Sequence, residues 1–316
     1  MVAGGDPLTL NQLRYVVETA EAHSITEAAA RLFITQPSLT SAIHALEEEL
    51  GIRIFTRTNK GIRVTADGEE FLAYARQMLW QERLMHQRYG KRQDGKPRFS
   101  VSAQHYSFAI EAFVDLLREV GETRYEFHMR ETETYRILED VGTLRSEVGV
   151  LYRSPYNATV IMRAIAAHGL RFTPLFRARP HVFISKRNPL AAKEEVTLAD
   201  LRDFPRLSYE QGDHNAFYFA EELQSTLPAD KELIVTDRAT LFNLLIGLGG
   251  YTISSGVINA ELNGADIIAR PLRVTDYMEV GVVQHGRVRA SNYARRYIAC
   301  LKRRLPSEAE DAADSI

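Results

Sequence analysis

A run of short polar side chains between Gln36 and His44 could read the edges of DNA bases. Glutamine pairs well with adenine, hydroxyl groups suit several bases, and an apolar group such as a proline ring can touch the thymine methyl. An ordinary solvated helix face could have the same composition, so the neighbouring residues must decide between the two interpretations. The candidate base-side residues are Gln36, Pro37, Ser38, Thr40, Ser41 and His44.

A basic ribbon follows this run. Residues 53–65 contain Arg53, Arg57, Lys60 and Arg63 and no acidic residue. Apolar residues flank an Asn-Lys-Gly turn, a pattern that predicts two short paired strands. Cations beside a base-reading helix suit phosphate groups, which position a protein on DNA without reading its sequence. The ribbon favours a DNA-contacting face, with Arg53 and Arg57 as candidate contacts.

Two short helices must position these side chains. Ser24 or Thr26 can cap the first, and three consecutive alanines within it would let a second helix approach closely. Thr35 can cap the second helix, whose apolar residues recur at helical spacing until Gly51 ends it. The spacing predicts a helix-turn-helix with a wing, a module that lays one helix into the major groove.

A longer helix is expected from about Ala66 to Tyr89, with apolar residues at roughly heptad spacing. Because this stripe is long relative to the small domain before it, we expect it to pair with a second chain. Folding back onto its own domain is the alternative. A two-fold dimer would require a roughly palindromic target. The stripe consists of Phe71, Leu72, Ala75, Met78, Leu79, Met85 and Tyr89.

Beyond a charged, Gly- and Pro-bearing hinge at 90–97, strands and helices alternate. The βαβαβ order of residues 99–152 and a second set from Pro180 predict parallel sheets covered by helices. Helices are expected at 135–147, 198–201 and 216–224, among others.

Polar residues follow several of the expected strands, where open α/β sheets bind ligands. The first of these residues, Ser102, Gln104 and His105, come just before an expected helix. The backbone N–H groups at the start of a helix favour an anion such as a carboxylate. This set of hydroxyls, amides and one imidazole suits a small polar metabolite, although helix capping could explain each residue singly. The candidate effector-binding residues are Ser102, Gln104, His105, Thr132, Thr134, Tyr209, Gln211 and Thr240.

The N-terminal stretch resembles the DNA-binding domain of LysR-type transcriptional regulators. The resemblance is carried by AAARLFITQPSLTSAIHALEEELGIRIFTRTNKGIRVTADGEEF, with LNQLRY before it. It implies that Gln36, Pro37, Thr40 and Ser41 read bases and that Arg57 anchors the wing to the DNA backbone. Family members often carry arginine where this chain has Ser41, so one guanine reader and phosphate contact is missing here.

The same resemblance implies an α+β multidomain fold with a two-lobed effector domain like that of periplasmic binding proteins. It also implies a homodimer, and by extension a homotetramer. The strings SAQHY and TDRATLF resemble regulators of cysteine and methionine metabolism, which respond to small sulfur metabolites. The expected parts are a winged helix-turn-helix at 8–65, a dimerisation helix at 66–90, an effector domain at 91–306 and a disordered tail at 307–316. Within the effector domain, lobe I is expected at about 97–168 and 271–305, and lobe II at about 169–270.

Composition restricts the other function classes. The 316 residues, 45% hydrophobic and 25% charged, suit a soluble protein of two or three domains. The single cysteine, Cys300, excludes an internal disulfide framework. The chain shows neither a signal peptide nor a membrane-spanning stretch, so we expect a cytoplasmic protein.

An enzyme of α/β class, or a cytoplasmic small-molecule-binding protein without a DNA-binding role, is the alternative function. The nine histidines show no metal-binding pair, and Gly-x-Ser-x-Gly and P-loop motifs are absent. We therefore expect no catalytic residues, no metal and no cofactor. A transport binding protein would need a signal peptide and would not need a winged helix.

Overall fold

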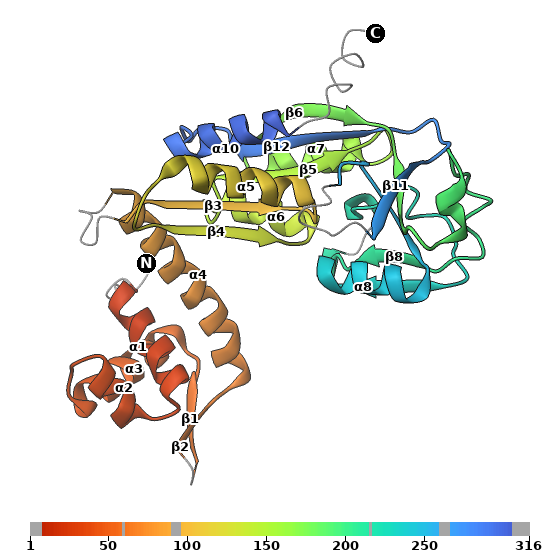
Figure 1. Ribbon diagram of the computed structural model, residues 1–316. Helices are drawn as coiled ribbons and strands as arrows, with labels where there is room; N and C mark the ends of the chain where they lie inside the picture. The colour runs from red at the N-terminus through yellow and green to blue at the C-terminus, as the bar shows by residue number, and fades with distance from the viewer. Residues whose placement is uncertain (1–7, 59–60, 90–95, 215–216, 259–265, 305–316) are drawn as a thin grey trace. The chain divides into compact units, whose positions relative to one another are not determined.

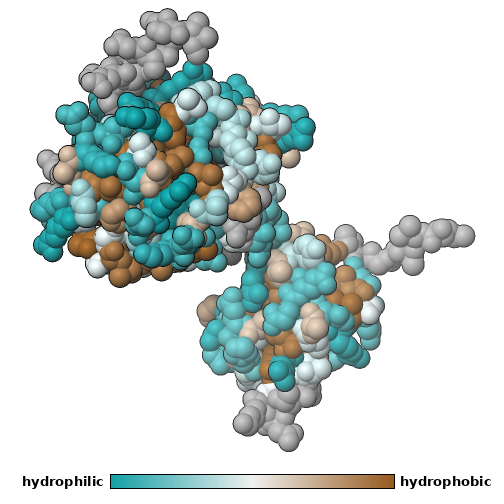
Figure 2. Space-filling model, turned by 90° about the vertical axis from the view of Figure 1, so that its right-hand side faces the viewer, coloured by the Kyte–Doolittle hydropathy of each residue, from teal (hydrophilic) through white to brown (hydrophobic). Residues whose placement is uncertain are grey.

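The computed structural model describes residues 8–58, 61–89, 96–214, 217–258 and 266–304. The chain forms two compact units, residues 1–94 and 95–316. Most of the predicted hinge at 90–97, and the whole predicted tail at 307–316, lie outside the described residues. Hydrophilic residues cover much of the face of each unit seen in Figure 2, with smaller hydrophobic areas between them.

The first unit is the predicted helix-turn-helix with a two-stranded wing (Figure 1). The side chain of Ser24 caps the second helix and that of Thr35 caps the third, which ends at Gly51 in the left-handed conformation. Gly51 has φ 68°, a value that glycine adopts without strain. The elements are α1 (Leu10–Ala22), α2 (Ile25–Arg31), α3 (Gln36–Leu50), β1 (Phe55–Thr58), β2 (Gly61–Val64) and α4 (Ala66–Tyr89).

One apolar core holds this unit together. Leu39, Ile43 and Leu46 of α3 are buried against Ala28 and Ala29 of α2. The small alanine side chains let the two helices approach closely, as the sequence predicts. The same core includes residues of α1, the wing and α4, so α3 is fixed from several sides.

The apolar stripe of α4 is divided between two faces. Leu72, Ala75 and Leu79 are buried, and Ala75 and Leu79 pack with Leu13 of α1. Folding back onto the domain, the alternative in the sequence, therefore accounts for these three residues of the stripe. Large apolar side chains still face outward on α4. They are Tyr74, Met78 and Met85.

The second unit contains two five-stranded sheets, and we call the parts built on them lobe I and lobe II. The sheet of lobe I has the order β4-β3-β5-β12-β6, in which β3, β4 and β5 are parallel and β12 is antiparallel to its neighbours. Its elements are β3 (Arg98–Ala103), α5 (Ser107–Val120), β4 (Glu126–Glu131), α6 (Thr134–Gly142), β5 (Val148–Arg153), α7 (Ala158–Ala167), β6 (Leu170–Ala178), β12 (Met278–His285) and α10 (Asn292–Arg303).

Helices cover both faces of this sheet (Figure 1). Successive side chains of a strand point to opposite faces, so Val150 joins the core under α5 and α10, whereas Leu151 joins the core under α6 and α7.

The sheet of lobe II has the order β11-β7-β10-β8-β9, with α8 packed against it. Strands β8, β9 and β10 are parallel, and β7 is antiparallel to both of its neighbours. Its elements are β7 (His181–Ser185), η1 (Pro189–Ala192), β8 (Arg206–Tyr209), η2 (Gly212–His214), η3 (Phe217–Phe219), β9 (Glu232–Val235), α8 (Arg238–Leu248), β10 (Tyr251–Ser254) and β11 (Ile267–Pro271).

Strand β6 shows that the predicted lobe boundary at residue 169 is wrong. All nine residues of β6 belong to the lobe I sheet, where the strand pairs with β12. Pro174 makes this strand difficult to predict from the sequence, because proline lacks the N–H that a central strand needs. The ladder accommodates it with a register shift between Val280 and Gly281, and Gly281 lies opposite Pro174.

Several predicted helices also differ from the structure. The helix expected at 135–147 ends at Gly142, and residues 198–201 form turns. The described part of 216–224 contains only η3 followed by bends and turns. The helix α7 was not predicted.

Two chain segments cross between the lobes, and they are hydrogen-bonded to each other. The first crossing lies between β6 and β7 and includes Pro180, and the second follows β11 and includes Leu272. The Leu272 N–H donates to the Pro180 carbonyl at 2.9 Å. Val196 also bridges to Leu272, which adds a third segment to the junction.

Candidate functional site

The predicted base-side residues share the outward face of α3. Gln36, Pro37, Ser38 and Ser41 are exposed, and Thr40 is half-buried. The Thr40 hydroxyl donates to the Gln36 carbonyl at 3.0 Å, which leaves its oxygen lone pairs available as acceptors. The face is polar and accessible because Leu39, Ile43 and Leu46 of α3 point into the core on the other side of the helix.

A buried carboxylate, which the sequence analysis missed, joins this helix to the wing. Glu47 Oε1 accepts the backbone N–H groups of Ile54 at 2.7 Å and Phe55 at 3.0 Å, and Oε2 accepts from Arg53 at 3.0 Å. Burial alone would raise the pKa of Glu47, but these donors lower it below its ordinary value. Glu47 therefore holds the start of the wing against α3.

Two of the predicted DNA contacts are affected by this arrangement. The guanidinium of Arg53 is held by Glu47 and also lies 3.4 Å from Nδ1 of His44. The side chains of Arg53 and His44 nevertheless remain largely exposed. The side chain of Arg57 lies outside the described part of the chain. Glu47 is four residues after the inward-facing Ile43, and this helical spacing could have revealed it.

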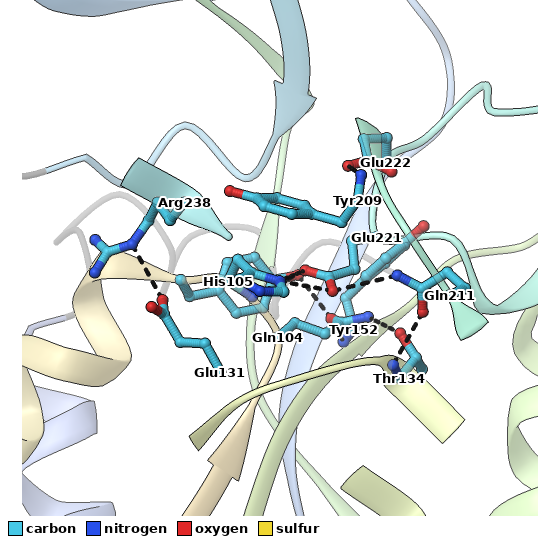
Figure 3. A network of polar contacts seen from close by, with 11 residues as sticks. Gln104, His105, Glu131, Thr134, Tyr152, Tyr209, Gln211, Glu221, Glu222 and Arg238 are labelled. Atoms are coloured by element: carbon cyan, nitrogen blue, oxygen red, sulfur yellow. Dashed lines mark hydrogen bonds and ion pairs between the residues drawn. The ribbon is translucent and has the colours of Figure 1, made fainter. Parts of the chain in front are cut away.

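In the second unit, a chain of polar contacts joins lobe I to lobe II (Figure 3). The Gln104 side chain donates to Thr134 Oγ1 at 2.6 Å and accepts the backbone N–H of Tyr152 at 2.9 Å. The Thr134 N–H, at the start of α6, donates to the side chain of Gln211 across the lobes at 3.0 Å.

A buried ion pair lies beside this chain. Glu221 Oε2 accepts the backbone N–H of His105 at 2.8 Å, and Oε1 lies 2.9 Å from Nδ1 of the same residue. Both side chains are only 4% exposed, and the Tyr209 ring stacks on the imidazole with centroids 3.9 Å apart. Burial lowers the pKa of His105, but the carboxylate of Glu221 more than offsets this and raises it above its ordinary value.

Two further acidic groups lie near this pair. Glu131 of lobe I pairs with Arg238 of lobe II at 3.1 Å. Glu222 Oε1 accepts the backbone N–H of Tyr209 at 3.0 Å, whereas its buried Oε2 has no hydrogen-bond partner among the described residues. Burial raises the pKa of Glu222 well above its ordinary value.

Little space remains where the lobes meet. The interlobe hollow has a cavity volume of about 20 Å³, room for about one water molecule. A second hollow of about 350 Å³ shares Glu222 with it. The interlobe hollow is lined by His105, Tyr106, Ser107, Phe183, Tyr209, Glu221, Glu222, Arg238, Phe242, Thr252, Ile253, Ser254 and Val257.

Five of the eight predicted effector residues come together in this network. They are Gln104, His105, Thr134, Tyr209 and Gln211.

The other three lie elsewhere. Ser102 is fully buried inside lobe I, where its hydroxyl donates to Asp140 at 2.6 Å. Thr240 is exposed, and its N–H donates to the cap residue Asp237 at 2.8 Å. Thr132 is half-buried and its N–H extends the pairing of β4 by donating to the Ala103 carbonyl.

Four charged residues of the site were not named as candidates. Glu131 begins a segment that the strand-end rule does indicate, because it is the last residue of β4. Glu221 and Glu222 were not identified because they fall within the helix that was expected at 216–224. Arg238 lies in the same helical turn as Thr240, and only Thr240 was chosen as a candidate there. The missed residues are Glu131, Glu221, Glu222 and Arg238.

Two family matches cover most of the chain. Residues 10–69 match the family described as "Bacterial regulatory helix-turn-helix protein, lysR family", and residues 123–306, more than half of the chain, match the "LysR substrate binding domain". The chain belongs to the LysR family. It is a DNA-binding transcriptional regulator with an effector-binding domain, and not an enzyme.

Known relatives of this LysR-family chain are similar over different lengths. AlsR of Bacillus subtilis is 27% identical over 252 residues, which cover 79% of this chain and 78% of AlsR. ClcR of Pseudomonas putida is 46% identical over 72 residues, covering 23% of this chain and 24% of ClcR.

The solved structure of full-length CbnR complexed with its target DNA has the same fold. Its TM-score is 0.57 at 17% identity, and the match covers 94% of this chain and all of CbnR. No helix among the described residues is long and apolar enough to cross a membrane.

Proposed function

We propose that this LysR-family regulator binds a pseudo-palindromic DNA duplex in the cytoplasm as a homodimer. The observation that carries the proposal is the exposed polar face of α3 beside a wing held by Glu47. The CbnR structure with target DNA supports it, because the two proteins share a fold. The proposed base-side residues are Gln36, Pro37, Ser38, Thr40, Ser41 and His44, with Arg53 and Arg57 on the phosphate side.

The dimer would form through the outward face of α4. Its three exposed large apolar side chains have no role in the core of their own unit, and exposed apolar surface of this kind is typical of interaction sites. Pairing two such dimers into a tetramer is the further step that the family resemblance implies.

A small polar effector would bind between the lobes, and sulfur metabolites are the class that the sequence resemblance suggests. The interlobe network supports this site, since its members come from both lobes and a ligand there would change how they meet. Such a ligand can act only through different affinities for the two lobe arrangements.

Replacing Gln36 or Thr40 with alanine is expected to weaken binding to the operator and relax its sequence preference. Each base contact that is lost should cost about 1–3 kcal/mol of discrimination. Fluorescence anisotropy, on duplexes selected in vitro with the native protein, measures both effects. Glu49→Ala, an exposed change near the end of the same helix, is the control. Unchanged affinity and preference in both variants would refute the base-reading assignment.

Replacing Arg57 with alanine is expected to weaken binding to all duplexes alike. A lost phosphate contact lowers the slope of log affinity against log salt by about 0.9. Titrations at several salt concentrations test this, with the exposed Arg76→Ala of α4 as the control. A loss confined to one sequence would assign Arg57 to base reading instead.

A further inference from the structure

We propose that the effector is a zwitterion, a small molecule such as an apolar α-amino acid that carries an ammonium and a carboxylate group close together. This inference rests on the proposed interlobe effector site. It specifies the chemical class that the site selects.

The charges that line the interlobe hollow come in both signs. His105 and Arg238 provide two cationic groups, and Glu221 and Glu222 provide two acidic ones. A purely anionic ligand would bring another negative charge next to both glutamates, and uncompensated buried charge is costly. A zwitterion adds no net charge and offers each lining charge an opposite partner.

The protein's own Glu221 already occupies the place of a ligand carboxylate. It accepts the His105 backbone N–H and contacts the imidazole, two donors beside the start of α5. A carboxylate brought by a ligand could take over these donors and add Arg238, which lines the same hollow.

The exchange also leaves a place for the ammonium group. Glu222 Oε2 is buried and lacks a hydrogen-bond partner among the described residues, and Glu221 would be released when its donors are taken. An ammonium group has three N–H donors and can serve both carboxylates. Both charges of the ligand would therefore have partners of opposite sign in the hollow.

The remaining walls of the hollow indicate what else the ligand carries. Phe183, Phe242, Ile253 and Val257 line it and suit an apolar side chain. Because the cavity volume is only about 20 Å³, the stacked rings of His105 and Tyr209 must separate to admit an amino acid. Binding is thereby coupled to the contact between the lobes.

The first test is thermal unfolding of the full chain with apolar L-amino acids and matched analogues. For leucine the analogues are 4-methylpentanoate, which lacks the ammonium, and 3-methylbutylamine, which lacks the carboxylate. We expect at least one amino acid to raise the midpoint by roughly 5–10 °C at a hundredfold excess over its Kd, and its analogues to have little effect. An equal shift from the carboxylic acid alone, or none from any apolar amino acid, would overturn the proposal.

The second test uses Glu222→Gln, which keeps the shape of the side chain but replaces one of its two acceptor oxygens with an NH2 donor and removes the acidic group. The variant should bind the amino acid roughly 10–100-fold more weakly and unfold near the native midpoint without ligand, because the amide oxygen can still accept the backbone N–H of Tyr209. Exposed Glu210→Gln in the same lobe is the control. Native affinity in Glu222→Gln would show that Glu222 does not bind an ammonium group of the ligand.

The failure of this inference can be told apart from that of the proposed function. Operator binding is measured on the same samples, and it does not depend on which effector is found. A midpoint shift from a sugar or a simple anion would keep the interlobe site and reject the zwitterion. Absence of sequence-specific DNA binding would instead contradict the proposed function.

Discussion

Replacing Glu47 with alanine is expected to destabilise the DNA-binding unit by about 3 kcal/mol and to abolish tight operator binding. The change leaves the backbone N–H groups of Ile54 and Phe55 without their acceptor, and each buried unsatisfied donor costs about 1–3 kcal/mol. The wing would then lose its fixed position against α3. Urea unfolding followed by the fluorescence of Trp80, the single tryptophan, measures the loss.

The neighbouring residue gives a matched control. Glu48 is exposed on the same helix, so Glu48→Ala should change the free energy of unfolding by less than about 0.5 kcal/mol. If Glu47→Ala is no less stable than Glu48→Ala, the anchoring role of Glu47 is wrong.

The contribution of Glu47 should also depend on pH. Because its pKa lies below the ordinary 4.5 in the folded protein, the stabilisation is present above that pH and is lost as pH falls through the lower, folded value. The stability difference between the native protein and Glu47→Ala should shrink in acid.

Replacing Glu221 with alanine is expected to lower the free energy of unfolding of the effector-binding unit by about 3 kcal/mol. Removing one partner of a buried ion pair costs about 3–5 kcal/mol, and the ability of His105 to release its proton places this case at the lower end. Urea unfolding followed by circular dichroism measures the change. Glu210→Ala, an exposed change in the same lobe, should have little effect.

The pH dependence has the opposite sign to that of Glu47. Burial lowers the pKa of His105, but Glu221 and Glu131 together raise it above 6.5, and Arg238 adds only a small lowering effect. The stabilisation is therefore fully present below pH 6.5 and is lost as pH rises through the raised value. A difference between native and Glu221→Ala proteins that stays constant with pH would exclude the charged pair.

The DNA-binding unit could be predicted almost completely, because its signals are local. Ser24, Thr35 and Gly51 mark helix ends within a few residues of the periodic apolar positions they delimit. The wing follows from its turn and its alternating apolar residues. Glu47 was missed because acidic residues near a helix end are usually solvated, and its partners lie beyond the helix.

The effector-binding unit was harder to predict because its decisive contacts are long-range. Nothing near Ser102 in the chain indicates that Asp140 binds its hydroxyl inside lobe I, since 38 residues separate them. The separation of His105 and Glu221 is 116 residues. The strand-end rule indicated the region where the lobes meet, but only the fold determines which polar residues face the hollow.

The hydrogen bond between the two crossing segments has a consequence for how a signal is transmitted. Because Pro180 and Leu272 are joined at 2.9 Å, the two chain crossings between the lobes lie at one place. We expect them to rotate about a single axis there. Any ligand that opens or closes the hollow would then rotate the lobes about the same axis, in one direction or the other. Substitutions among the hollow's side chains could therefore retune the protein to a new metabolite while the mechanical output to DNA stays unchanged.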